Sequence, residues 1–395
     1  MFVRIIKESM EIKSIVFIGA YAKNTLHQLY DTGLLHASSL CSDKVVCYKD
    51  KSTFTFIKES EEKYNFGENI ELRSIRAYAP HNKLLYVLGM LLSGLTSVFL
   101  LFKTKREDVV IYAYNNLFAL HTLNFFNKFL HRKIVISCHG EMELLTNNVQ
   151  GSIANIHRLI LTDFFKKRKA DDNIRFLLLG DSMVKNIQPY VSSHNIRHFC
   201  SIECPCYMED VQQVASSIKK TIKIGVLGTL SPIKGLSEMI SFIVKLKEKG
   251  IDFDFSVIGG VSMGNKKYSE ILEKYNVNIK GGSLPRYLFE KEILNLDFVV
   301  FFYPRDSYKL IASGTLLDAI ALNKPVIALK NDYFNYILKK TEHPSILCDN
   351  VDEMVDSFVE GRANDLYNMD FNSSKSLFSP VSISKQLQIV IDSLL

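Results

Sequence analysis

The sequence lacks the cysteine spacing that marks most structural zinc sites. Its 395 residues contain seven cysteines, an odd number, and no two of them form a Cys-x-x-Cys pair. Three lie close together, at positions 200, 204 and 206, but structural zinc sites usually draw their thiolates from such pairs. We therefore predict no metal site, and the scattered thiols are typical of a protein from a reducing compartment.

Other features are missing as well. No internal repeat and no segment of low complexity stands out, and there is no long basic tail or RNA-binding signature. The apolar run at 15–18 is short for a secretory signal, charges precede it and no cleavage site follows. These absences favour a cytoplasmic globular protein that binds no nucleic acid. The apolar fraction of 47% fits a folded chain, and the length suffices for two domains.

Positive charge is concentrated in the first half of the chain. Residues 1–199 carry 26 Lys and Arg against 18 Asp and Glu, whereas residues 200–395 carry 22 against 24, which gives a net charge of +6. A basic half indicates an anionic partner such as a lipid headgroup or a phosphorylated acceptor, but a slightly basic solvated surface explains it equally well. Peripheral contact with an anionic membrane, at the cytoplasmic face of the inner membrane, is therefore one expectation.

One apolar run, Leu84 to Phe102, contains no charged residue and just reaches the length of a membrane-spanning helix. The strand-like segments on either side of it look like members of one parallel sheet, which a spanning helix would separate. Gly89, Ser93 and Ser97 repeat every four residues, so one helical face is small enough to pack closely on that sheet. We predict a buried helix, with an interfacial helix as the second interpretation and a spanning helix as the third.

Short apolar runs alternate with helical patterns from end to end, which is typical of parallel sheets covered by helices on both faces. The predicted strands of the first half are Ser14–Ile18, Lys44–Tyr48, Leu72–Tyr78, Val109–Tyr112, Lys133–Cys138, Arg175–Leu179 and His198–Ile202. Those of the second half are Lys223–Leu227, Asp254–Ile258, Val277–Ile279, Phe298–Phe302, Val326–Leu329 and Ser345–Leu347.

The predicted fold class is α/β, with two tandem doubly wound Rossmann-like domains facing a central cleft. Residues 204–220 hold Pro205 and mixed charge without a clear strand, so we place a linker there. The first domain is then 1–203 and the second 221–378. We expect the remaining segment, 379–395, to form a helix that crosses back to the first domain.

Two Gly-bearing turns of the second half each follow a strand and precede a helix. Helix starts expose unpaired N–H groups and a partial positive charge, so they hold phosphate well. A lysine at a helix start, as at position 234, is unfavourable unless an anion binds there, which favours contact with a diphosphate. An acid one turn into the second helix is placed to accept from ribose hydroxyls, although the helix dipole also explains it. The predicted donor-binding residues are Gly228, Thr229, Lys234, Gly235, Ser313, Gly314, Thr315 and Asp318.

A third motif, His139-Gly140-Glu141, ends the predicted strand Lys133–Cys138. Enzymes built on parallel sheets place catalytic groups at the carboxyl ends of strands. His139 is the candidate base for an acceptor hydroxyl or a contact to the transferred sugar, and Glu141 either orients it or serves as the base. A strand-end histidine is also often a hydrogen-bonded structural residue.

Residues 222–331 resemble the donor half of GT-B glycosyltransferases, group 1 (family 4-like). The segments Gly228–Gly235, Val257–Gly260 and Ser313–Ile327 carry the resemblance, which extends to the first half only through its layout and His139–Glu141. It implies that Lys234 binds the donor diphosphate, that the helix start at Ser313 binds phosphate and that the carboxylate of Asp318 binds ribose.

The sequence departs from that family at two positions. Thr229 stands where the family usually has arginine, and Leu310 stands at the first of two paired glutamates, with Asp318 at the second. Candidate donor-sugar contacts near this place are Arg305, Asp306 and Tyr308.

The resemblance implies a metal-independent glycosyltransferase without a cofactor. Its donor would be a nucleotide-sugar, UDP- or GDP-linked, and its acceptor a glycan or lipid-linked molecule of surface polysaccharide or glycolipid synthesis. Two other functions fit the same pattern. One is a sugar-nucleotide epimerase of the same fold, and the other is a catalytically inactive relative that serves as a binding or assembly partner.

Overall fold

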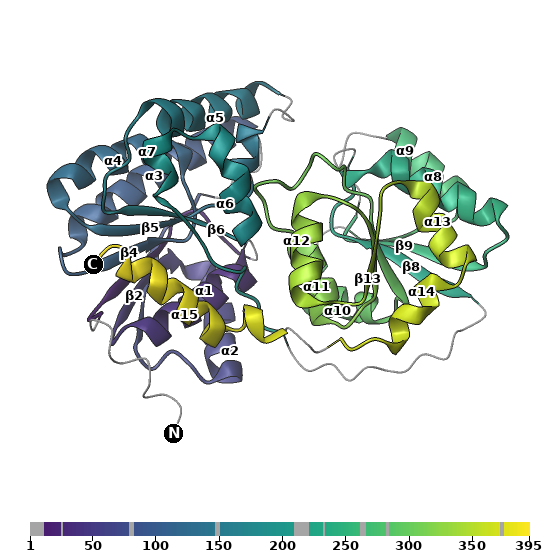
Figure 1. The fold of residues 1–395 in the computed structure, drawn as a ribbon. Helices are drawn as coiled ribbons and strands as arrows, with labels where there is room; N and C mark the ends of the chain where they lie inside the picture. The colour runs from purple at the N-terminus through teal and green to yellow at the C-terminus, as the bar shows by residue number, and fades with distance from the viewer. Residues whose placement is uncertain are drawn as a thin grey trace. The chain divides into compact units, whose positions relative to one another are not determined.

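The computed structural model describes residues 12–24, 27–78, 83–146, 151–208, 221–231, 234–260, 266–281, 284–371 and 375–395. These residues form two compact units (Figure 1). The first comprises the described residues up to Tyr207 together with Leu310–Ala312 and Leu377–Leu395, and the second comprises those of Met208–Lys309 and Ser313–Ser376. Of the segment predicted as a linker, residues 204–207 belong to the first unit and 209–220 lie outside the described residues.

The first unit is built on a parallel sheet whose described strands follow the order β3-β2-β1-β4-β5-β6-β7. Every residue of β1 and β4 is buried, as expected for apolar strands covered on both faces. The strands are β1 (Ile15–Gly19), β2 (Val45–Asp50), β3 (Ile70–Ile75), β4 (Val109–Tyr112), β5 (Lys133–Ser137), β6 (Ile174–Leu178) and β7 (Phe199–Ser201).

The helices of the first unit connect and cover these strands. They are α1 (Gln28–Cys41), α2 (Phe54–Tyr64), α3 (Lys83–Lys103), α4 (Leu117–Leu130), α5 (Ser152–Thr162), α6 (Asp181–Ile187), α7 (Ser193–Ile196) and α15 (Pro380–Asp392), with shorter turns η1 (Lys51–Thr53), η2 (Gly140–Leu145), η3 (Asp163–Lys167) and η4 (Gln188–Tyr190). The C-terminal helix α15 packs against α1, where the Cys41 thiol lies 3.3 Å from the carbonyl oxygen of Ser384. Its buried face includes Ile383, Leu387 and Ile391.

The second unit repeats the plan, with described strands in the order β10-β9-β8-β11-β12-β13, all parallel. Its strands are β8 (Ile222–Leu227), β9 (Phe253–Ile258), β10 (Asn278–Lys280), β11 (Phe298–Phe301), β12 (Val326–Leu329) and β13 (Ser345–Cys348). Its helices are α8 (Leu236–Glu248), α9 (Lys266–Lys274), α10 (Arg286–Leu294), α11 (Gly314–Ala321), α12 (Asp332–Thr341), α13 (Val351–Val359) and α14 (Arg362–Asp365), followed by η6 (Leu366–Asn368). The short helix η7 (Lys375–Phe378) spans the boundary between the two units. The predicted fold of two doubly wound α/β units is confirmed, and each predicted strand has an observed counterpart within a few residues.

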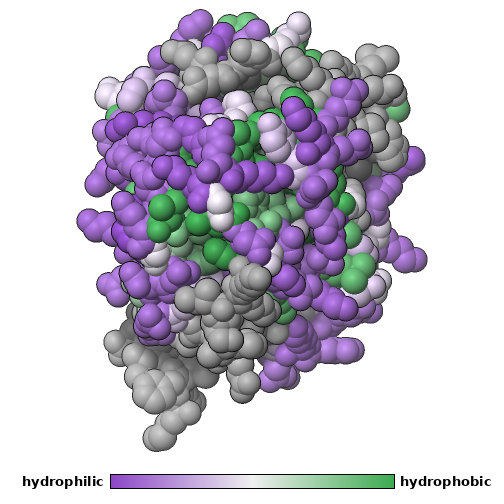
Figure 2. Space-filling model, turned by 90° about the vertical axis from the view of Figure 1, so that its right-hand side faces the viewer, coloured by the Kyte–Doolittle hydropathy of each residue, from purple (hydrophilic) through white to green (hydrophobic). Residues whose placement is uncertain are grey.

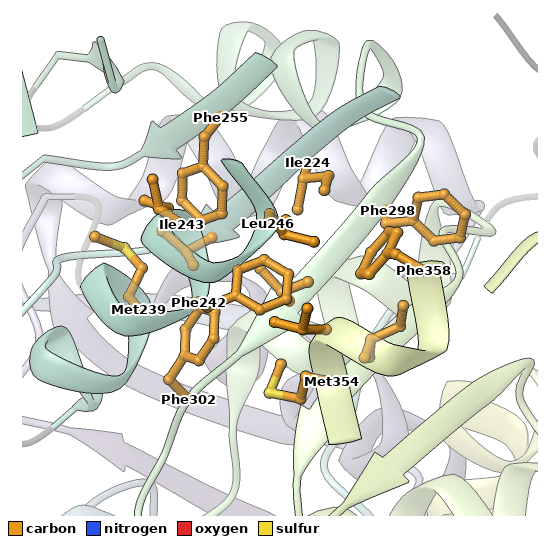
Figure 3. Packing of buried hydrophobic residues seen from close by; sticks show 14 of the residues in the cluster. Ile224, Met239, Phe242, Ile243, Leu246, Phe255, Phe298, Phe302, Met354 and Phe358 are labelled. Atoms are coloured by element: carbon orange, nitrogen blue, oxygen red, sulfur yellow. The ribbon is translucent and has the colours of Figure 1, made fainter. Parts of the chain in front are cut away.

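An apolar cluster between the sheet and helices α8 and α13 forms a core of the second unit (Figure 3). Phe242 of α8 lies at its centre, with ring contacts to Phe255, Phe302 and Phe358. The face of the molecule in Figure 2 is mostly hydrophilic, with hydrophobic side chains gathered in a small central region. The strands and helices of this unit are therefore held by ordinary burial of apolar side chains.

The small residues of helix α3 lie where the helix packs on the sheet. The hydroxyl of Ser93 donates to the carbonyl oxygen of Ala20 at 3.0 Å, and Tyr112 of β4 donates to the carbonyl oxygen of Ser97 at 3.1 Å. A side chain at Gly89 would meet the carbonyl oxygen of Tyr78 at 2.7 Å. The small-residue face is therefore packed at the sheet, as predicted. Among the described helices α3 alone is long and apolar enough to cross a membrane, and 44% of that stretch is buried.

In each sheet the strand order reverses beside its first strand, between β1 and β4 and between β8 and β11. Crossover helices leave opposite faces of the sheet at such a point, so the carboxyl ends of the two strands border an open place where ligands bind. The turns after β8 and β11 and a small pocket after β1 and β4, both described below, lie at these positions.

Candidate functional site

In the second unit, the first Gly-bearing turn follows β8 and brings its backbone close to neighbouring loops. Gly228 has a φ of 81°, and its N–H donates to the carbonyl oxygen of Ile258 at 2.7 Å. A side chain at this position would lie 3.0 Å from Cγ2 of Thr315 and 3.3 Å from Nζ of Lys234. Glycine at this position therefore lets one residue from each of the two predicted turns approach the backbone closely.

Lys234 extends over the ring of Tyr303, with its Nζ 5.6 Å from the ring centroid. Among the residues that the structure describes, no carboxylate forms an ion pair with this ammonium group. The next residue, Gly235, has a φ of 74°, and a Cβ there would lie 1.9 Å from the carbonyl oxygen of Phe302. Glycine is required for α8 to start this close to β11, and that start fixes where Lys234 points.

The second turn begins α11. The hydroxyl of Ser313 caps the helix by accepting from the N–H of Leu316 at 3.3 Å. The hydroxyl of Thr315 lies 3.3 Å from that of Tyr303, and an added Cβ on Gly314 would meet no atom within 4 Å. The first amides of α11 therefore face open space beside Tyr303, the ring that also contacts Lys234.

The structure thus brings the two predicted turns together at the switch point between β8 and β11. Three features favour an anion there: the Lys234 ammonium, which has no carboxylate partner among the described residues, the amides of a helix start and the helix dipole. The open space at Gly314 admits an anion to direct contact with the first main-chain N–H groups of α11. This combination suits a phosphate or diphosphate.

Asp318 lies one turn into α11 and is held in a network that the sequence did not reveal. Its carboxylate accepts from Nη1 of Arg286 at 2.7 Å, and Arg286 also donates to Glu290 at 2.6 Å. Burial raises the pKa of the Asp318 carboxyl, and the guanidinium of Arg286 partly offsets that shift. A ribose contact by Asp318 would therefore involve a carboxylate already oriented by Arg286.

The three candidate sugar contacts are placed differently from one another. The ring of Tyr308 stacks on Tyr303 at 4.6 Å, next to Lys234, and Tyr308 has a φ of 58°, rare for a residue other than glycine. Arg305 and Asp306 are exposed, and Asp306 pairs with Lys309 at 3.4 Å. Thr229 is exposed at the turn after β8. Tyr308 is therefore the one of the three that the structure places beside the anion-binding groups.

In the first unit, His139 follows β5 and is buried among aromatic rings. Its Nε2 lies 2.9 Å from the carbonyl oxygen of Ala113, which accepts only, so Nε2 carries the proton and Nδ1 is the free acceptor. Burial, with a smaller effect of nearby His27, lowers the pKa of His139 to about 3. A histidine with so low a pKa is a weak base, and its geometry suits a neutral hydrogen bond to a sugar hydroxyl better than proton removal.

Glu141 folds back on the motif that contains it. Its two carboxylate oxygens accept from the backbone N–H of His139 at 3.0 and 2.9 Å, so the side chain fixes the turn that presents the histidine. Burial raises the pKa of the Glu141 carboxyl to about 7, against smaller opposing effects of its hydrogen bonds. Glu141 is therefore poised to exchange a proton near neutral pH, but its first contact is the backbone of His139.

This shift makes stability depend on pH. Because the folded-state pKa of Glu141 lies above its ordinary value of 4.5, its contribution is complete below about pH 4.5 and is lost as pH rises through about 7. The variant Glu141→Gln does not titrate, so its free energy of unfolding should rise relative to that of the wild type by about 3 kcal/mol across this window. Urea denaturation of both proteins at several pH values measures the difference. A difference that is flat with pH would contradict the prediction.

Sequence reasoning missed the groups that surround His139. The carboxylate of Asp31 on α1 pairs with the ammonium of Lys49 at the end of β2, and their side chains are only 3% and 2% exposed. The ring of His27 lies edge-on to His139 at 4.8 Å, and those of Tyr21 and Tyr114 stack at 4.2 Å. The residues Gly19, Tyr21, Ala22, His27, Asp31, Ala113 and Tyr114 line a small pocket at the switch point between β1 and β4.

Among the described residues, no group of three or more His, Cys, Asp or Glu side chains is arranged to hold a metal ion. The cysteines at 200, 204 and 206 form no disulfide. Metal independence remains a prediction.

The architecture is that of known GT-B structures. TarM of S. aureus, in complex with Fondaparinux, alpha-GlcNAc-glycerol and UDP, matches with a TM-score of 0.63 over 96% of this chain and 99% of its own, at 12% identity. HepE of Anabaena with UDP and glucose gives 0.61 over 95% and 98%, also at 12% identity. The lipopolysaccharide outer core galactosyltransferase WaaB gives 0.59 over 97% and 100%, at 14% identity. At such identities the similarity establishes the GT-B fold, as the resemblance predicted.

No protein-family model matches the sequence, and no curated protein is detectably similar to it.

Proposed function

We propose that this protein is a metal-independent glycosyltransferase that moves a sugar from a nucleotide-sugar to a glycan or a lipid-linked acceptor. The observation that carries the proposal is the meeting of Lys234, Thr315 and Gly228 at the switch point of the second sheet. The Lys234 ammonium next to the open amides of a helix start suits the charge that develops on a departing nucleoside diphosphate. The first unit would supply the acceptor, near His139 and its aromatic neighbours.

The ligands and names of the structural relatives support a particular class of donor and of acceptor. UDP occupies the structures of TarM and HepE, which supports a UDP-sugar ahead of a GDP-sugar. WaaB is a galactosyltransferase of the lipopolysaccharide outer core, and TarM was solved with a glycosylated glycerol. By analogy with these relatives, we place this protein in the synthesis of a surface polysaccharide or glycolipid.

A nucleotide panel tests the donor site. We expect UDP to raise the melting temperature more than GDP, ADP or CMP, because a ligand at about 100 times its Kd adds about 2.7 kcal/mol to the stability of the unit that binds it. Thermal-shift measurements with each nucleotide at equal concentration give the order. Equal shifts of the melting temperature with all four nucleotides would mean that the site does not distinguish the bases. The absence of a shift with any of them would contradict the proposed donor site.

An epimerase of the same fold would also bind UDP-sugars, but it would convert the donor in the absence of any acceptor. Incubation of the protein with UDP-sugars alone, followed by chromatographic separation of sugar epimers, distinguishes the two. We expect no epimer to form.

A further inference from the structure

Three helices of the first unit carry an exposed apolar surface that the transferase proposal does not use. On α3 its side chains are Leu85, Leu88, Leu91, Leu95, Phe99 and Phe102, each between 41% and 66% exposed. Phe129 of α4 and Leu159 of α5 extend it, at 69% and 66% exposed. We call this surface the three-helix face.

The three helices lie side by side, which places their exposed apolar side chains on neighbouring helices. The rings of Phe102 on α3 and Phe126 on α4 meet edge-on at 5.0 Å. The ring of His157 on α5 lies 6.1 Å from Tyr86 on α3 and 5.8 Å from Phe118 on α4. Figure 1 shows α3, α4 and α5 grouped on one side of the first sheet.

The exposed residues of α3 follow one another at intervals of three or four, so they form a single stripe about 25 Å long. The opposite, small-residue face is the one that hydrogen-bonds at the sheet through Ser93 and Ser97. Packing of α3 on the sheet therefore does not use the stripe. Monomeric soluble proteins rarely leave so large a continuous apolar surface in water.

Positive charge surrounds this surface. Residues 83–169 hold 12 Lys and Arg against 5 Asp and Glu, whereas the rest of the chain holds 36 against 37, so this segment accounts for the whole positive charge of the protein. Lys105 and Arg106 are exposed just after α3, and Lys166 and Lys167 just after α5. Two of the five acids, Asp108 and Glu141, are buried.

We propose that the three-helix face binds the surface of an anionic lipid bilayer. The outward leucines and phenylalanines would enter the boundary between headgroups and acyl chains, and the flanking lysines and arginines would contact lipid phosphates. The inner face of α3 is fixed to the sheet, so the helix lies along the bilayer and does not cross it. A second copy of this chain fits the face less well. In a two-fold dimer the lysines and arginines that flank the face would lie opposite the same residues of the second copy and repel them.

The test measures sedimentation of the purified full-length protein with two kinds of vesicle. One kind is phosphatidylcholine alone, and the other contains phosphatidylcholine and phosphatidylglycerol in equal parts. We expect strong binding to the anionic vesicles, weakening as salt is added, and little binding to the neutral ones. The variant Leu95→Gln/Leu159→Gln should reduce the binding constant about tenfold, because it removes two inserted side chains.

A matched control comes from α15 of the same unit, where Val381 and Ile389 are exposed to 54% and 71%. The variant Val381→Gln/Ile389→Gln should bind vesicles like the wild type. Loss of charge in Lys105→Gln/Arg106→Gln should lower binding to anionic vesicles only. UDP binding, measured in parallel, should be unchanged in all three variants, which separates this inference from the proposed donor site.

Several results would overturn the inference. One is a wild type that stays in the supernatant with both vesicles, and another is equal loss of binding in the α15 control. A third is a wild-type dimer in light scattering that becomes monomeric in Leu95→Gln/Leu159→Gln, which would assign the face to a second copy of the chain.

Discussion

Replacing Lys49 with methionine is expected to lower the free energy of unfolding of the first unit by about 3 to 5 kcal/mol. The methionine would leave the Asp31 carboxylate, 3% exposed, without the ammonium that neutralises it. Moving a charge out of water is costly, and the pair repays that cost only while both partners remain. Gly19 belongs to the same arrangement, because a Cβ there would lie 2.9 Å from Cγ of Lys49.

The measurement is urea denaturation of each variant followed by circular dichroism. Lys51, two positions further along and exposed, provides the matched control, and Lys51→Met should change stability by well under 1 kcal/mol. The double variant Asp31→Leu/Lys49→Met removes both charges and should recover most of the loss. If Lys49→Met proves as harmless as Lys51→Met, the buried ion pair contributes nothing to the stability of this unit.

The fold could be predicted from the sequence because each strand is a short apolar run between helical segments. Val109–Tyr112 and Val326–Leu329 were predicted with their observed ends. Such a strand is buried on both faces, and its apolar composition alone is enough to indicate this. The ends of β3 were predicted wrongly, as Leu72–Tyr78 instead of Ile70–Ile75, since none of its residues is fully buried.

The site was predictable only in part. Glycine at positive φ and a polar cap before a helix leave local signals, so the turns at Gly228, Gly235 and Ser313 were found. Contacts between residues that are far apart in the sequence leave no such local signal. Arg286 reaches Asp318 across 32 positions and Lys49 reaches Asp31 across 18, and each lysine or arginine looks solvated until the chain is folded.

Replacing Lys234 with alanine is expected to lower the rate of sugar transfer by about a hundredfold or more and to weaken UDP binding by about tenfold. The ammonium has no carboxylate partner among the described residues and stands beside the open amides of α11, so a bound diphosphate would be its counter-ion. Binding loses one charge-assisted contact, whereas transfer also loses stabilisation of the leaving group, which explains the larger effect on rate.

Isothermal titration with UDP and a transfer assay with a UDP-sugar measure the two effects separately. Lys249, exposed at the other end of α8, is the control, and Lys249→Ala should leave both unchanged. Kinetics and affinity in Lys234→Ala that match the wild type would exclude Lys234 from the site. A wild type that binds UDP tightly but transfers sugar to no acceptor would instead indicate a binding protein, in which Thr229 and Leu310 replace groups that catalysis requires.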